Sequence, residues 1–135
     1  MAQIYQMKNI FCFIIITAFI SAIISCKKSD DTTPSTFTGT WHVTSNHTIT
    51  TQQHWDMTIV AGSSASEILL DNFDQIGNTN HVTATVSGSS FTIPQQTVSS
   101  TVFKGTGSLS NGNLSFNYTA DDGVRIDTVS ATAHK

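Results

Sequence analysis

The stretch that decides the fold reads TVFKGTGSLSNGNLSFNYTADDGVRIDTVSATA, residues 101–133. Apolar and polar side chains alternate through it, as they do in β-strands that bury one face. Two dipeptides interrupt the alternation, Asn111-Gly112 and Asp122-Gly123. Both favour the positive φ angles that a tight type I′ hairpin turn requires. The stretch therefore predicts three strands joined by two hairpins, each strand antiparallel to its neighbours in the sequence.

The same alternation continues outward to residue 39, and no window has the sustained 3.6-residue period of an amphipathic helix. Ser87-Gly88-Ser89 is a third, weaker turn signal. Threonine, which favours strands, is frequent throughout. The fold class that we expect is therefore all-β. The predicted strands are residues 39–50, 54–61, 66–72, 80–87, 90–94, 101–109, 113–120 and 123–133.

Eight strands joined as a meander leave two exposed edges unless the sheet closes on itself. A small eight-stranded antiparallel up-and-down barrel removes both edges, and it is the architecture that we expect for residues 37–135. A two-sheet β-sandwich is the alternative. The tight hairpins favour the barrel, because sandwiches of this length usually connect strands across their two sheets.

Charge and cysteine content exclude several classes of protein. Residues 37–135 contain 7 Asp and Glu against 3 Lys and Arg, so the net charge is 3 − 7 = −4 with histidine neutral. A nucleic-acid-binding domain needs a basic surface, and we therefore expect no nucleic-acid partner. Both cysteines, Cys12 and Cys26, precede the domain, which leaves it without a disulfide or a thiolate metal site.

The N-terminal segment has the character of an export signal. Residues 10–24 are mostly apolar, which is the length of a secretory signal and too short for a stable transmembrane helix. The end of this apolar run and the two residues after it read Ile23-Ile24-Ser25-Cys26, which resembles the lipobox of bacterial lipoproteins. The resemblance implies a lipoprotein signal peptide over residues 1–25 and transfer of a diacylglycerol to the Cys26 thiol. It also implies cleavage before Cys26 and acylation of the new amino terminus, with palmitate as an example of the acyl chains. Residues 26–36 are then a lipidated cysteine and a polar tether, and the membrane is a partner through this anchor.

A short charged segment follows the cysteine. Residues 27–31 read KKSDD and resemble the export tag of surface lipoproteins of Bacteroidota. This resemblance implies a lipid-anchored protein of the cell outer membrane that is exposed at the cell surface. The periplasmic face of the same membrane is the alternative.

The start of the first predicted strand has a second family likeness. Gly39-Thr40-Trp41 resembles the Gly-x-Trp opening of lipocalins and the wider calycin barrels. Residues 71–73, 81–86 and 89–96 resemble small lipocalin-like lipoproteins of Bacteroidota. In the lipocalin family the tryptophan closes one end of the barrel and an arginine of the last strand lies across it. The resemblance implies that Trp41 and Arg125 form this barrel-closing pair.

Two strands carry the residues that are candidates for ligand binding. Trp55, Met57 and Ile59 alternate on one predicted strand, and Phe116 and Tyr118 alternate on another. Each set points to one face of its strand. Such a set can form the wall of a pocket for a small ligand or can be part of a packed core, and the sequence leaves both alternatives open.

We find no pattern that predicts catalysis, a metal site or a cofactor. His42, His47, His54 and His81 do not have the spacing of metal ligands on a helix, and His42 and His47 face opposite sides of one strand. The serines lack a nucleophile elbow. We therefore expect a non-enzymatic envelope protein that binds a small apolar or amphipathic ligand in one open end of its barrel. The alternative is a structural or accessory subunit of an outer-membrane or surface complex, with an envelope protein as its partner and no small-molecule ligand.

Overall fold

A computed structural model describes residues 34–135 of the protein, which belong to one compact unit. The predicted signal peptide at residues 1–25, the lipidation residue Cys26 and most of the tether lie outside the described residues. No helix in the described part of the chain has the length and apolar character that a membrane crossing requires.

The described chain consists of eight strands and two short 3-10 helices. The helix η1 (Pro34–Thr36) precedes the first strand, and η2 (Phe73–Gln75) lies between the third and the fourth. The strands are β1 (Gly39–His47), β2 (Gln53–Ala61), β3 (Glu67–Asp71), β4 (His81–Ser87), β5 (Ser90–Val98), β6 (Thr101–Ser110), β7 (Asn113–Asp121) and β8 (Ile126–His134).

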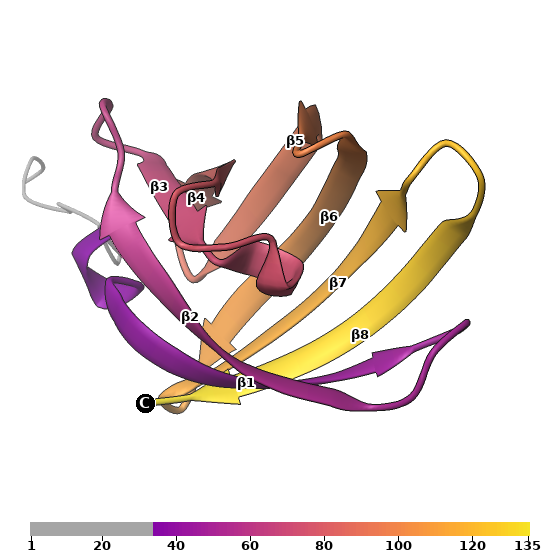
Figure 1. Cartoon of the computed structure of the whole chain (residues 1–135). Helices are drawn as coiled ribbons and strands as arrows, with labels where there is room; N and C mark the ends of the chain where they lie inside the picture. Colours follow the sequence, from indigo (N-terminus) through magenta and orange to yellow (C-terminus); the bar gives the residue numbers. More distant parts are fainter. Residues whose placement is uncertain (1–33) are drawn as a thin grey trace, which may run out of the picture. The chain divides into compact units, whose positions relative to one another are not determined.

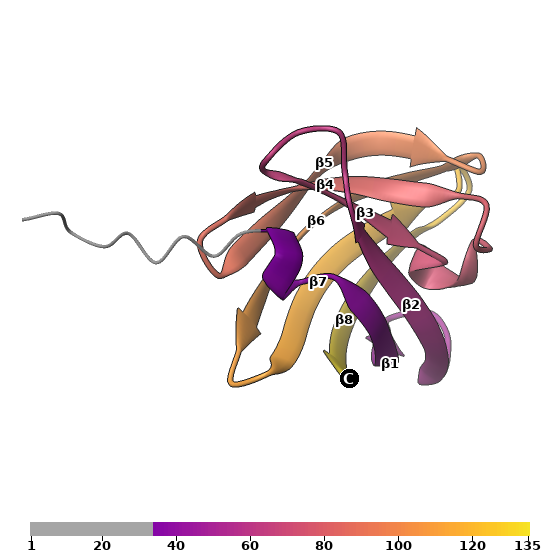
Figure 2. The ribbon, with the colours of Figure 1, turned by 90° about the vertical axis from the view of Figure 1, so that its left-hand side faces the viewer.

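The sheet closes into a barrel. Every strand pairs antiparallel with the next one along the chain, and β8 pairs with β1 from His42↔His134 to His47↔Val129 (Figure 1). The view in Figure 2 shows the strands wrapping round a common interior. The predicted up-and-down barrel is therefore confirmed and the sandwich alternative is not adopted, so the sheet has no open edge.

The interior of the barrel is filled by side chains. Inward and outward positions alternate along each strand, most regularly in β8, where every second residue from Asp127 to Ala133 is buried. Within residues 34–135, twenty-one hydrophobic residues form one core cluster, as expected for an eight-stranded barrel of this size. Two glycines of β6 allow this packing, since an added Cβ would lie 2.3 Å from the Phe91 ring at Gly107 and 2.5 Å from the Asn117 carbonyl at Gly105.

The connections between strands lie at two ends of the barrel. We call one end the mouth, and we define it by residues 48–52, 72–80, 99–100 and 122–125, which join β1 to β2, β3 to β4, β5 to β6 and β7 to β8. The opposite end contains the other connections together with η1 and Lys135. Pro34, where the described chain begins, is therefore at the end opposite the mouth.

The turns follow the predicted chemistry only in part. Asn111 and Gly112 have φ angles of 51° and 78°, which confirms a hairpin turn of the type I′ kind. The two-residue turn predicted at Asp122-Gly123 is wrong. The Asp122 carboxylate accepts hydrogen bonds from the backbone N–H groups of Val124 (2.9 Å) and Arg125 (2.7 Å), and these bonds hold a four-residue connection, so that β8 begins at Ile126 rather than at residue 123.

Strand β5 is longer than predicted. The predicted strand ends at Pro94, and proline cannot donate a ladder hydrogen bond. The structure accommodates Pro94 in an irregularity of the β5–β6 register between Ile93 and Gln96, after which pairing resumes as far as Val98↔Thr101.

The predicted contact between Trp41 and Arg125 is also corrected. Trp41 is buried near the end opposite the mouth, where its indole N–H donates to the Phe37 carbonyl at 2.7 Å. Arg125 is exposed in the β7–β8 connection at the mouth, because β8 runs antiparallel to β1 and therefore starts at the other end. The cation over the Trp41 ring is instead Lys135, whose Nζ lies 4.8 Å from the ring centre.

Candidate functional site

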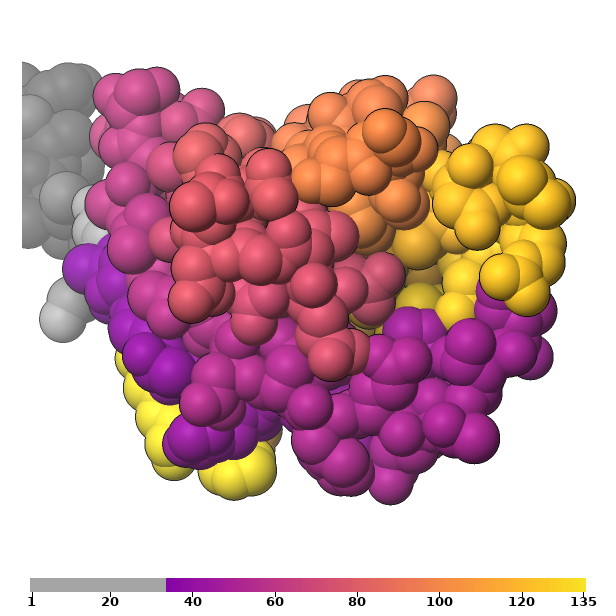
Figure 3. Space-filling model, in the orientation of Figure 1, coloured from indigo at the N-terminus to yellow at the C-terminus, as the bar shows by residue number. Residues whose placement is uncertain are grey.

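The mouth contains a cavity of about 260 Å³ with mixed polar and apolar walls. In Figure 3 the surface is hollowed where η2 and the segments around the β1–β2 and β7–β8 connections meet. All four connections or their flanking strand ends contribute side chains. The residues that line the cavity are His47, Ile49, Thr50, Gln53, Asp74, Thr101, Ala120, Asp122, Arg125 and Asp127.

A chain of buried hydrogen bonds joins β1 to β8 at this cavity. His47 Nδ1 lies 2.7 Å from an Asp127 oxygen, and His47 Nε2 lies 2.9 Å from the Ser45 hydroxyl. When Nδ1–H donates to the carboxylate, Nε2 accepts from Ser45. Ser45 is fully buried, so the imidazole is held between two partners inside the barrel.

Asp127 has a second set of donors. Its other oxygen accepts from the Thr48 backbone N–H at 2.9 Å and from the Thr48 hydroxyl at 2.7 Å. Burial alone would raise the pKa of Asp127, but the hydrogen bonds from Thr48 and His47 outweigh burial and lower it. The carboxylate is therefore ionised at neutral pH and ties the end of β1 to the start of β8.

A second pair crosses the cavity from η2 to β7. The Tyr118 hydroxyl donates to the Asp74 carboxylate at 2.6 Å. Burial is the main reason that the pKa of Asp74 is raised, and the hydrogen bond from Tyr118 only partly opposes it. The pKa of Tyr118 is raised as well, first by burial and then by the charge of Asp74. This pair brings a poorly solvated carboxylate to the mouth.

The backbone that carries Asp74 is strained. Asn72, Asp74 and Gln75 have φ angles of 56°, 50° and 63°, a region that costs a residue other than glycine roughly 1–3 kcal/mol. Two contacts hold the segment in place: the Asn72 side chain donates to the Asp56 carbonyl at 2.8 Å, and Phe73 is fully buried in the core. Backbone strain of this kind is common at functional sites.

Three exposed hydrophobic residues, Ile49, Val124 and Ile126, form an apolar lip at the mouth, and of the three Ile49 lines the cavity. Val124 is 86% exposed, Ile126 63% and Ile49 45%. Val124 is on the β7–β8 connection and Ile126 is the first residue of β8, so the two flank Arg125. Ile49 is on the neighbouring β1–β2 connection, which a hydrogen bond from Thr48 N–H to the Thr128 carbonyl ties to β8. Among residues 34–135 the remaining exposed large hydrophobic residue is Val60 on β2. Three of the four exposed large hydrophobic residues in this part of the chain are thus at the mouth.

The five residues predicted to contact a ligand lie in the core. Trp55, Met57, Ile59, Phe116 and Tyr118 face inward, as the alternation predicted, and each is at most 8% exposed. They pack against one another and the opposite strands, and Trp55 and Tyr118 also line open hollows on the outside of the sheet. Tyr118 alone among them reaches the mouth, through its hydroxyl. The Trp55 indole N–H is buried without a hydrogen-bond partner among the described residues.

Two contacts at the mouth were not predicted from the sequence, that of His47 with Asp127 and that of Tyr118 with Asp74. The alternation in β8 carried one usable signal, because Asp127 shares the parity of Val129, Ala131 and Ala133 and therefore faces inward. No comparable signal identified Asp74, which belongs to an irregular connection.

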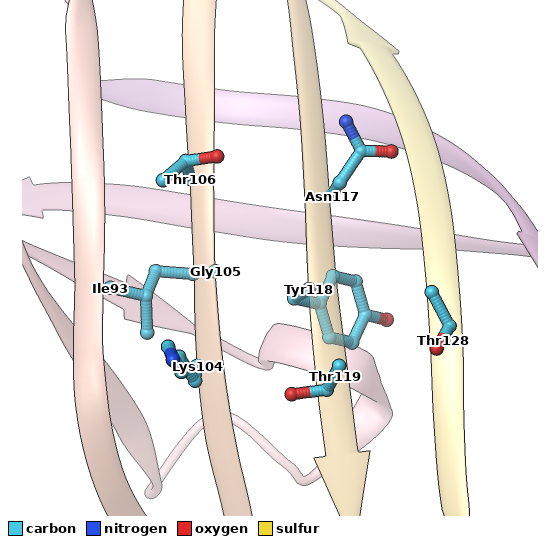
Figure 4. Close-up of a pocket in the computed structure, with 8 residues that line it drawn as sticks. All are labelled: Ile93, Lys104, Gly105, Thr106, Asn117, Tyr118, Thr119 and Thr128. Carbon is cyan, nitrogen blue, oxygen red and sulfur yellow. The ribbon is translucent and has the colours of Figure 1, made fainter.

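Another hollow, of about 360 Å³, is a groove on the outside of the sheet (Figure 4). Exposed Lys104, Thr106 and Asn117 contribute to its wall. It has no buried charge and no strained backbone, and the mouth is therefore the stronger candidate site.

The fold and its mouth define a small, closed up-and-down β-barrel with a polar opening at one end. A redesigned β-barrel of known structure is similar, with a TM-score of 0.56 and 18% sequence identity over 76% of this chain and 93% of that one. A likeness at this identity shows the fold alone. No family model and no curated protein matches the sequence.

Proposed function

We propose that the protein is a lipid-anchored cell-envelope protein whose barrel binds a small amphipathic ligand at its mouth. The lipobox-like sequence ending at Cys26 supports the anchor. The lipocalin-like assignment is part of this proposal and rests on Gly39-Thr40-Trp41 and on the barrel fold, although Arg125 does not occupy the place that the family gives to its arginine. A tether attached at Pro34 enters the barrel opposite the mouth and does not need to cross it.

The observation that carries the proposal is the position of the apolar lip beside the polar cavity. A ligand with a polar head and an apolar tail matches both, with its head in the cavity and its tail on Val124, Ile126 and Ile49. The filled core leaves the ligand no path deeper into the barrel. The cavity is lined by three carboxylates, of Asp74, Asp122 and Asp127, against the single guanidinium of Arg125, and this excess favours a head group with positive charge.

The test uses residues 31–135, which contain the whole barrel, and three single-chain amphiphiles below the concentrations at which they form micelles. Dodecyltrimethylammonium, dodecanoate and dodecyl maltoside have matched tails and differ in head-group charge. We expect saturable 1:1 binding by calorimetry, tightest for the cationic amphiphile. The pair of substitutions Val124→Ser and Ile126→Ser should weaken it at least tenfold, or about 1.4 kcal/mol.

The matched control is Val60→Ser, since this valine is exposed on β2 away from the mouth. It should leave the affinity unchanged. Saturable binding of none of the three amphiphiles, or equal losses in the lip and control variants, would refute the proposal.

A second candidate function is that of an accessory subunit of an envelope complex with no small-molecule ligand. The filled core and the exposed lip also suit a protein partner, because exposed apolar patches mark interaction sites. A photo-crosslinking residue at position 124 in living cells should then form an adduct with an envelope protein. The same residue at position 60 should form none.

A further inference from the structure

We propose that the outer face of β8, β1 and β2 is a binding site for a divalent transition-metal ion, with His42 and His134 as its protein ligands. The two histidines are far apart in the sequence but lie directly opposite each other in the β1–β8 register. Both are exposed, and their ring centres are 5.6 Å apart. The closure of the barrel therefore creates an imidazole pair on a surface well away from the mouth cavity.

The distance between the rings suits a shared ion. Zinc–nitrogen bonds are about 2.0–2.1 Å long, so two nitrogens on one ion are at most about 4 Å apart. His134 is exposed and can change rotamer, and a small rotation of the rings, whose centres are 5.6 Å apart, brings one nitrogen of each to that separation. Neither side chain has to leave a buried partner for this movement.

Asp56 gives His42 the orientation of a metal ligand. His42 Nδ1 lies 2.6 Å from the Asp56 carboxylate on the paired strand β2. A ligating histidine usually donates its second ring N–H to a carboxylate, which fixes the tautomer and makes the free nitrogen more basic. The N–H at Nδ1 donates to Asp56, and Nε2 of His42 is then left with its lone pair for the ion.

The neighbouring surface leaves room for the ion and its water molecules. An open hollow of about 350 Å³ lies over β1 and β2, and His42, Thr44, His54 and Asp56 line it. His54 is engaged with the Thr44 hydroxyl at 3.0 Å. As the side chains stand, no three His, Cys, Asp or Glu residues among residues 34–135 are placed to hold one ion, and water therefore completes the coordination of the two imidazoles.

The donor set indicates which ions bind. Imidazole nitrogen suits copper, nickel and zinc, while magnesium and calcium prefer oxygen. Among these ions a nitrogen site binds Cu²⁺ most tightly. The imidazoles must be deprotonated to ligate the ion, so the affinity falls as the pH is lowered.

The experiment is a calorimetric titration of residues 31–135, which contain no cysteine, with Cu²⁺ and separately with Zn²⁺. We expect one ion per chain and tighter binding of Cu²⁺. His42→Asn and His134→Asn should each weaken binding at least tenfold. Asp56→Asn should weaken it about tenfold, the lower end of the range for partners of ligating histidines.

The matched control is His81→Asn. His81 is also exposed and lies 3.7 Å from a carboxylate, that of Asp71, but its strand neighbour is that aspartate and not a second histidine. This variant should bind both ions as the unaltered domain does. The proposal is overturned if the domain binds neither ion, if either His42→Asn or His134→Asn binds as tightly as His81→Asn, or if Asp56→Asn has no effect. Thermal unfolding of each variant without metal checks that the barrel is intact.

Discussion

The Lys135 ammonium lies 4.8 Å from the centre of the Trp41 ring and donates a hydrogen bond of 2.7 Å to the Thr38 carbonyl. It follows β8 immediately, so these contacts fasten the last strand to the segment that leads into the first. The end of the barrel opposite the mouth is thus closed by a cation over a tryptophan, and the cation is a lysine.

From this contact we predict that substitutions of Lys135 and Arg125 have different effects on the free energy of unfolding. Trp41→Ala should cost about 3–5 kcal/mol of the free energy of unfolding, because it removes a fully buried tryptophan. Lys135→Met should cost about 0.5–1 kcal/mol, as expected for an exposed cation over an aromatic ring. Arg125→Met should cost close to nothing, since Arg125 is exposed at the opposite end.

Urea unfolding of single and double variants gives the coupling, with Trp41→Phe replacing alanine if the latter does not fold. Lys135→Met and the Trp41 variant should be non-additive, and Arg125→Met should be additive with it. Coupling between Trp41 and Arg125 would contradict the structure.

Asp127 should contribute stability in a defined pH range. Its pKa is lowered on folding, so its contribution is fully present above the usual carboxyl pKa of 3.8 and is lost as the pH falls through the lower folded value. Asp127→Asn should reduce the free energy of unfolding at pH 7 by about 1–3 kcal/mol, because the amide keeps only one acceptor oxygen, so that the donors of either His47 or Thr48 lose theirs. The deficit should shrink below pH 3.8 in urea titrations. A deficit that is independent of pH would exclude the ionised carboxylate as its source.

Asp74 should have the opposite effect on how the free energy of unfolding depends on pH. Its pKa is raised by burial, so the folded barrel loses stability as the pH rises from 3.8 through the folded value of this pKa. Asp74→Asn keeps an acceptor for the Tyr118 hydroxyl but removes the charge. The variant should therefore gain stability relative to the unaltered domain between pH 4 and pH 7. A relative loss over this interval, measured in the same titrations, would mean that the charge of Asp74 is stabilised in the mouth.

Much of this fold was predictable because side-chain alternation has the same period as the strand itself. The alternation located all eight strands, and tight turns such as Asn111-Gly112 implied the antiparallel order. The barrel-closing contact was misplaced because Trp41 lies near the start of β1 and Arg125 lies just before the start of β8, and antiparallel neighbours start at opposite ends of the barrel.

The mouth itself was less predictable, for a physical reason. His47 meets Asp127 only because β1 and β8 become neighbours when the barrel closes, and Asp74 meets Tyr118 because η2 reaches the end of β7 at the mouth. No local pattern records such a pairing. The same applies to His42 and His134, which the β1–β8 register brings together.

The β5–β6 turn offers a stabilising change. Ser99 and Ser100 have φ angles of 49° and 68°, which serine adopts at a cost but which Asn-Gly adopts readily. Replacing them together by Ser99→Asn and Ser100→Gly should raise the free energy of unfolding by about 1 kcal/mol. The control is Ser89→Gly in the β4–β5 turn, because Ser89 is not among the residues with positive φ. It should not stabilise the domain, and an equal gain from both changes would show that strain at Ser99 and Ser100 is not the cause.

Membrane attachment is predicted to depend on one sulfur atom. If Cys26 carries the anchor, Cys26→Ser should abolish incorporation of labelled palmitate, because serine lacks the thiol that receives the diacylglycerol. It should also move the protein out of the membrane fraction, since each buried methylene of the acyl chains contributes about 0.8 kcal/mol to membrane binding. Cys12→Ser is the matched control: it alters the other cysteine of the same segment and should change neither result. Palmitate labelling of the Cys26→Ser protein, or equal losses in both variants, would show that the lipobox-like sequence is not the attachment site.

Protease added to intact cells expressing the unaltered protein then distinguishes the two faces of the outer membrane, because only a surface-exposed barrel is accessible to it.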